Sequence, residues 1–118
     1  EEGIIIRESG LMYRVLRAGR GKYHPAQGTP CTYHYLLQLI DGTEIQSSYK
    51  LGKPVVDALD GSISGFSEAL ELVVEGDQWV IYVPSELAYR SRGIGMIPGG
   101  AALVFLVELL EVHGKVDL

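Results

Sequence analysis

The sequence has little of what disulfide, metal or nucleophilic chemistry requires. Its single cysteine, Cys31, cannot form an internal disulfide and has no second thiol with which to hold a metal. The three histidines, His24, His34 and His113, lack the close spacing to one another or to carboxylates that is typical of metal ligands. No Gly-x-Ser-x-Gly segment supports a serine hydrolase. We therefore expect no metal and no cofactor, and we expect Cys31 to be a half-buried strand residue.

Excess positive charge and long apolar runs are also missing. Ten basic residues face fifteen acidic ones, and the net charge is −5, whereas nucleic-acid binders usually carry a basic patch. No apolar run approaches the ~20 residues of a membrane span. The glycine-rich run Gly93–Gly100 precedes a strand and lacks the Lys-Ser/Thr ending of a phosphate loop. We expect one domain that binds neither nucleic acid nor phosphate and does not span a membrane.

The termini say little about location. No signal peptide is visible, and a start at Glu1 instead of Met favours a processed or truncated form. Residues 115–118 (KVDL) loosely resemble a K-D-E-L retention signal, although a chance terminus is the favoured interpretation. The cytoplasm and the secretory pathway both stay open, and this likeness tips the expectation towards the secretory pathway.

What the sequence does contain is fifteen glycines between short alternating apolar segments, a pattern typical of an antiparallel sheet. The dipeptide Asp41-Gly42 predicts a type I′ hairpin turn. The last segment is apolar on both faces, which predicts a central strand. Strands are expected over residues 11–16, 31–40, 43–47, 55–56, 78–83 and 101–112.

One helix is expected, over residues 63–74. Ser64 is its predicted N-cap, and Gly76 is placed to stop it. A short helix on one face of an antiparallel sheet makes an α+β fold. The apolar stripe of this helix is Phe66, Ala69, Leu70, Val73 and Val74.

Several short segments, in their order and spacing, carry a family resemblance. They are Tyr33-His34-Tyr35, Asp41-Gly42-Thr43, Ser47-Ser48, Leu87-Ala88-Tyr89, and the loop through Met96–Gly100 into an apolar strand. Together they resemble the FKBP-type peptidyl-prolyl isomerases, the immunophilins that bind tacrolimus and rapamycin. The segments 67–70 (SEAL) and 75–79 (EGDQW) look like the macrophage infectivity potentiator branch.

The resemblance implies an FKBP-like antiparallel half-barrel sheet wrapped around one short α-helix. This domain is expected over residues 11–113, with an N-terminal extension over 1–10 and a C-terminal tail over 114–118. The implied partners are proline-containing polypeptides and macrolides such as tacrolimus or rapamycin.

The resemblance also implies a shallow apolar pocket. Phe66, at a position that is often Trp in the family, matches the floor, and the Tyr89 hydroxyl matches a group that bonds a substrate carbonyl. The backbone N–H of Ile63 matches a ligand donor, and Ile97 lies on an overhanging loop. Without the resemblance, each apolar residue of the set would be assigned to the core. Catalysis is assigned to Tyr35, Phe66, Tyr89 and Phe105, and ligand binding to Ile45, Gln46, Val55, Ile63, Ala88 and Ile97.

Such a pocket suits the reaction. Rotation about an X-Pro amide has a barrier of ~20 kcal/mol because the planar form is stabilised by resonance. An apolar pocket disfavours the charge-separated planar form relative to the twisted one. Selective binding of the twisted form is then sufficient for catalysis, without an acid, a base or a metal.

Departures from the family pattern gather at this site. Gln46 replaces a pocket Asp, Leu51 replaces the Arg that pairs with that Asp, and Arg90 replaces a Gly. The segment 57–62 is shorter than usual. These changes predict a weakened isomerase with weakened macrolide binding. A catalytically weak binding module for proline-containing or apolar segments is the alternative, and a purely structural domain is a third interpretation.

Overall fold

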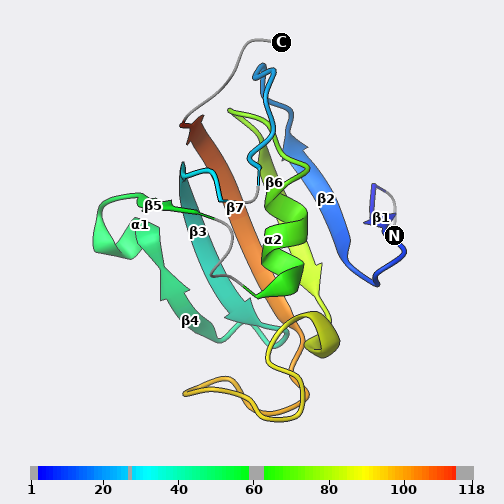
Figure 1. Ribbon diagram of the computed structural model, residues 1–118. Helices are drawn as coiled ribbons and strands as arrows, with labels where there is room; N and C mark the ends of the chain where they lie inside the picture. Colours follow the sequence, from blue (N-terminus) through cyan, green and yellow to red (C-terminus); the bar gives the residue numbers. More distant parts are fainter. Residues whose placement is uncertain (1–2, 27, 59–62, 114–118) are drawn as a thin grey trace.

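The computed structural model describes residues 3–26, 28–58 and 63–113, so the expected tail over 114–118 and most of the short segment 57–62 lie outside it. Within these ranges, seven strands form one antiparallel sheet in the order β1-β2-β6-β7-β3-β4, and β5 also pairs with β3. Helix α2 (Ser64–Leu70) lies across one face of the sheet (Figure 1). The α+β half-barrel is confirmed. The strands are β1 Ile5–Ile6, β2 Met12–Arg17, β3 Cys31–Leu39, β4 Glu44–Ser47, β5 Val55–Asp57, β6 Gln78–Val83 and β7 Leu103–Val112.

Strand β7 is central, as its two apolar faces predict. It lies between β6 and β3 and pairs with both along its length. Trp79, Ile81 and Val83 of β6 all face the core, as their period of two predicts. Cys31 at the head of β3 is fully buried (0% exposed), so the expectation of a half-buried residue is wrong. The sheet face under α2 is therefore the core.

Helix α2 ends earlier than the apolar stripe predicts, and the expected span of 63–74 is wrong. The Leu72 N–H bonds to the Ala69 carbonyl (2.9 Å), which tightens the last turn. The Val74 N–H then bonds to Oδ2 of Asp77 (3.0 Å), so a carboxylate takes the donor that a continuing helix would have used. Val73 still reaches the core, but from the irregular segment that follows the helix.

Both predicted caps of this helix are also wrong. The N-cap is Ile63, which makes no side-chain cap bond, while the Ser64 hydroxyl donates to the Leu87 carbonyl (3.3 Å). Gly76 lies beyond the end of the helix. It adopts a φ of +93°, and its N–H bonds to the Leu109 carbonyl (2.8 Å). The glycine therefore turns the chain towards β6 instead of stopping a helix.

The β3–β4 hairpin forms where it was predicted, but with a different turn. A type I′ turn needs positive φ at both central residues, whereas Gly42 (φ +92°) is left-handed and Asp41 is not. The Gly42 N–H bonds to the Leu39 carbonyl (3.0 Å), and the Thr43 N–H bonds to Oδ1 of Asp41 (2.9 Å). The connection is a three-residue loop with glycine at its left-handed position, so the type I′ prediction is wrong.

Helix α1 (Ser48–Leu51) was not predicted. Ser47 caps it by accepting from the Lys50 N–H (3.3 Å), and Gly52 (φ +77°) ends it. The helix separates β4 from β5 along the edge of β3 (Figure 1). There the Ser48 hydroxyl accepts from the Tyr35 N–H (2.7 Å) and donates to the Tyr35 carbonyl (3.3 Å). The buried Ser48 hydroxyl thus makes the two hydrogen bonds with the Tyr35 backbone that a neighbouring strand would otherwise make.

The expected N-terminal extension contains edge strand β1, which pairs with β2. Its link to β2 also contacts helix α2, because Arg7 and Ser9 bond the carboxylate of Glu68 at 2.6 Å and 2.7 Å. The boundary at residue 10 stays a prediction. Of the helices in the described ranges, none is long and apolar enough to cross a membrane.

Candidate active site

A pocket of about 510 Å³ opens beside helix α2, and strands β3, β4, β5 and β7 contribute to its walls. Eight of the ten predicted site residues line it, although they come from six separate segments of the chain. The eight are Tyr35, Gln46, Val55, Ile63, Phe66, Ala88, Tyr89 and Phe105.

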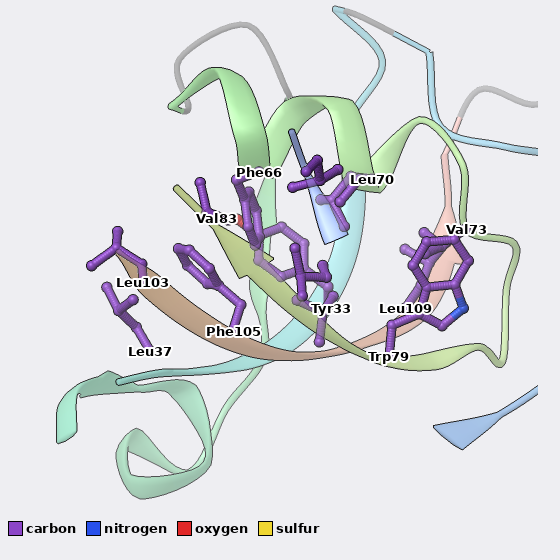
Figure 2. Packing of buried hydrophobic residues seen from close by; sticks show 14 of the residues in the cluster. Tyr33, Leu37, Phe66, Leu70, Val73, Trp79, Val83, Leu103, Phe105 and Leu109 are labelled. Carbon is purple, nitrogen blue, oxygen red and sulfur yellow. The ribbon is translucent and has the colours of Figure 1, made fainter. Parts of the chain in front are cut away.

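The floor of the pocket is aromatic. Phe66 projects from α2 and is 4% exposed, and its ring lies 4.8 Å from that of Phe105 and 5.5 Å from that of Tyr33, centroid to centroid. Figure 2 shows these rings together between the helix and the sheet. Gly65 lets the helix come this close, because a Cβ there would collide with Cγ1 of Val83. The floor is therefore aromatic and closely packed, while hydroxyl, amide and carboxylate groups belong to the rest of the lining.

Three tyrosines line the pocket, and two of them, Tyr35 and Tyr89, were predicted as site residues. Burial and, to a lesser extent, the neighbouring Tyr89 raise the pKa of Tyr35, so its hydroxyl keeps its proton at neutral pH. Tyr89 is carried by the turn after the short 3₁₀ helix η2 (Ser85–Leu87). That turn is fixed by the Arg90 N–H, which bonds to the Ser85 carbonyl (2.9 Å). Both hydroxyls can therefore donate to a carbonyl oxygen of a bound peptide.

Arg90 follows Tyr89 in a conformation that glycine adopts more easily. Its φ is +53°, in the left-handed region, which matches the glycine that the family usually has there. The Gly100 N–H bonds to its carbonyl (2.6 Å) and closes the base of the long loop before β7. An arginine thus occupies a left-handed position at the base of this loop.

Two predicted site residues lie outside the lining of this pocket. Ile45 lies at the β-bulge where β4 pairs with β3, and it packs against the core. Ile97 is 4% exposed and belongs to the core cluster. A pair of backbone bonds ties it to Ile94 across a tight turn of the loop (2.8 and 2.9 Å). Their roles in ligand binding stay predictions.

Three lining residues were missed: Tyr33, Leu37 and Asp57. The signal for the first two was present, because residues two apart on a strand share a face and both flank Tyr35. The same period relates Asp57 to Val55 on β5. The strand expected there ended at residue 56, one residue before the Asp57 carboxylate.

The polar groups differ from those that the resemblance implies. Gln46 contributes a neutral amide to the lining, and Leu51, at the position of the family's Arg, is 68% exposed on α1 and lies outside the lining. Among the residues that the structure describes, no group of three or more His, Cys, Asp and Glu side chains could hold a metal ion. The pocket offers shape, apolar surface, hydrogen bonds and the Asp57 carboxylate as its chemistry.

Comparison with known proteins agrees with this geometry. Residues 21–110 match the family model described as FKBP-type peptidyl-prolyl cis-trans isomerase. The FKBP-type 22 kDa peptidyl-prolyl cis-trans isomerase of Escherichia coli is 44% identical over 95% of the chain and 54% of its own length. The peptidyl-prolyl cis-trans isomerase Mip of Coxiella burnetii is 41% identical over 96% of the chain and 49% of its own length, in keeping with the likeness to the infectivity potentiators.

A solved structure gives the same answer for the fold. The crystal structure of FkpA from Escherichia coli superposes with a TM-score of 0.90 at 39% identity, covering 95% of this chain and 52% of that one. The chain thus spans about half the length of each of these three relatives. The match over most of its residues shows that this chain belongs to the FKBP-type peptidyl-prolyl cis-trans isomerase family.

Proposed function

We propose that this chain catalyses cis-trans isomerisation of X-Pro peptide bonds in polypeptides and so assists protein folding. The observation that supports this most is the gathering of eight predicted site residues around one apolar pocket. Membership of the family and the names of the relatives agree with the same activity.

In the proposed mechanism, the proline ring lies on Phe66 and is held between Tyr35 and Phe105, whose rings are 6.4 Å and 4.8 Å from that of Phe66. The backbone N–H of Ile63 and the hydroxyl of Tyr89 hold carbonyl oxygens of the substrate. The pocket excludes water from the amide and so favours its twisted form over the planar one. Each ~1.4 kcal/mol of this preference accelerates rotation tenfold.

We propose further that the site is weakened. Gln46 lines the pocket where the family usually has an aspartate, and Leu51 is exposed and cannot form an ion pair. A lost hydrogen bond to a charged acceptor costs about 1.5–3 kcal/mol. Tacrolimus or rapamycin should therefore bind about tenfold to a hundredfold more weakly than to a relative with the aspartate, which calorimetry can measure.

A binding module with little catalysis is the second candidate. The observation that favours it is the same neutral Gln46, because the apolar lining would still hold proline-containing segments without the full polar set. The two candidates differ in turnover and agree in binding.

The deciding experiment is a cis-to-trans assay on a Leu-Pro peptide over a range of protein concentrations. The isomerase predicts a rate that rises linearly with concentration and falls in Tyr89→Phe. A rate equal to the uncatalysed one, together with measurable peptide binding by calorimetry, would overturn the isomerase in favour of the binding module.

A further inference from the structure

Asp57 places a carboxylate at the edge of the apolar pocket. It lies at the end of β5, opposite Cys31 of β3, while Val55 lies opposite Tyr33. Because residues two apart on a strand share a face, Val55 and Asp57 both line the pocket. The carboxylate is therefore part of the surface that a bound peptide meets.

This carboxylate is the only ionised side chain among the described residues that line the pocket, which otherwise are aromatic, aliphatic or, at Gln46, an amide. Asp57 is exposed, and Oδ1 accepts from the N–H of Ala58 (2.8 Å), which orients the group. No lysine or arginine within the described ranges pairs with it. Its charge remains available to a ligand.

The field of Asp57 reaches across the pocket wall to β3. After burial, Asp57 is the next cause that raises the pKa of Tyr33. It also adds to the burial that raises the pKa of Cys31 to about 11. The negative charge that disfavours ionisation of these two groups would attract a cation bound near them.

We propose that Asp57 makes the pocket select X-Pro segments that carry a lysine or arginine close to the proline, and reject those with an acidic residue there. The inference rests on the proposed function, because it assigns a substrate class to the same pocket. An exposed ion pair is modest in strength, so attraction of lysine and repulsion of glutamate together should separate the two peptides by about threefold to tenfold. Since the pair is exposed, salt should reduce this preference.

The test uses proline peptides that differ only in one residue, Lys, Gln or Glu, placed within two positions before or after the proline. For each peptide, kcat/KM is measured at low and high salt, and Kd is measured in parallel by calorimetry. The variants are Asp57→Asn and Asp57→Lys. The matched control is Glu8→Gln, which removes one negative charge from an exposed site in the N-terminal segment.

We expect kcat/KM for the Lys peptide to exceed that for the Glu peptide by at least threefold at one of the tested peptide positions. Salt should reduce this ratio, and Glu8→Gln should retain it. The ratio should fall to about one in Asp57→Asn and invert in Asp57→Lys. Equal values for all three peptides, or a ratio that persists in Asp57→Asn, would overturn the inference.

The parallel readouts separate this inference from the proposed activity. A lysine preference in Kd without any acceleration would sustain the role of Asp57 and overturn the isomerase. Acceleration without a charge preference would sustain the isomerase and overturn the role of Asp57. Peptides that neither bind nor isomerise would overturn both proposals.

Discussion

At position 46 the pocket wall holds a neutral amide, and the nearest ionised group in the lining is Asp57 on another strand. An aspartate introduced at 46 would add a second negative charge to the same small pocket. Like charges and a partly buried carboxylate both destabilise the folded state. The effect of restoring the family residue therefore depends on whether a cation comes with it.

We predict that Gln46→Asp alone leaves the isomerase rate unchanged or lower, with a reduced melting temperature. Gln46→Asp combined with Leu51→Arg should exceed the wild-type rate, because the new pair forms a charge-assisted hydrogen bond. A double-mutant cycle on the rate and the melting temperature measures the coupling. Zero coupling would mean that positions 46 and 51 do not meet across α1.

Phe66 serves the core and the pocket at once, since its ring contacts Tyr33 and Phe105 while lining the cavity. Phe66→Leu should fold with a loss of about 1 kcal/mol, typical of hydrophobic exchanges of similar size. Turnover and peptide affinity should nevertheless fall several-fold, because the flat floor is lost. Urea unfolding beside a peptide titration tests this, and unchanged binding in the folded variant would remove Phe66 from the site.

At the scale of elements, helix α2 packs closely against β6 because Gly65 has no side chain that would collide with Val83. Helix propensity alone predicts that Gly65→Ala stabilises the fold by up to about 1 kcal/mol. The structure predicts the opposite, a loss of about 1–3 kcal/mol, because the added methyl overlaps Val83 and approaches Leu87. Thermal unfolding of Gly65→Ala decides the sign. Val83→Ala in the same background should recover part of the loss, and purely additive effects would count against this packing.

The junction of α1 and β3 depends on Ser48, which is fully buried and bonds both backbone groups of Tyr35. The Nδ1 atom of His34 also lies 2.8 Å from its hydroxyl. Ser48→Ala should lower the free energy of unfolding by about 2–4 kcal/mol, because the N–H and carbonyl groups of Tyr35 lose their hydrogen-bond partner. Amide exchange at Tyr35 should accelerate, and peptide affinity should fall with it.

Ser47→Ala is the matched control for this prediction. It removes only the N-cap bond to Lys50 and should cost about 1 kcal/mol without affecting exchange at Tyr35. Equal effects of the two substitutions would mean that Ser48 acts only as part of the helix.

At the scale of the whole molecule, alkaline pH should weaken the fold through Cys31. An ordinary thiol ionises near pH 9.0, whereas burial and then Asp57 raise the pKa of Cys31 to about 11 in the folded state. Below pH 9 both states keep the proton, so the contribution to stability is fully present. Between about pH 9 and pH 11 the unfolded state ionises first, and stability is lost.

Urea unfolding at several pH values measures this loss, which should be less steep in Cys31→Ala. The buried tyrosines contribute to the same fall, so the difference between the two proteins is the informative quantity. If stability falls equally steeply with pH in the wild type and in Cys31→Ala, the assignment of this loss of stability to Cys31 is contradicted.

Much of the architecture was predictable because it follows from local periodicity. The period of two in β3 and β6 sets which residues face the core. The apolar residues of β7 predicted its central place in the strand order, although only one of its faces is buried. Ten site residues were predicted by resemblance, and eight of them line one pocket, while their roles stay predictions. Local pattern failed where a side chain outside the expected element bonded to the backbone. Asp77 ended α2, and Ser48 replaced a strand beside Tyr35.

The sequence by itself determined the class of the fold and the central strand, because both depend on residue type and short-range spacing, whereas the aromatic set proposed for the site came from the family resemblance. Only the tertiary structure decided that Asp57 borders the pocket while Leu51 points to solvent. Both residues lie on the edge segments that follow β4, where short elements pair with β3 or leave it. Which side chains meet there depends on how the chain passes around α1, and that path is fixed by contacts between residues far apart in sequence.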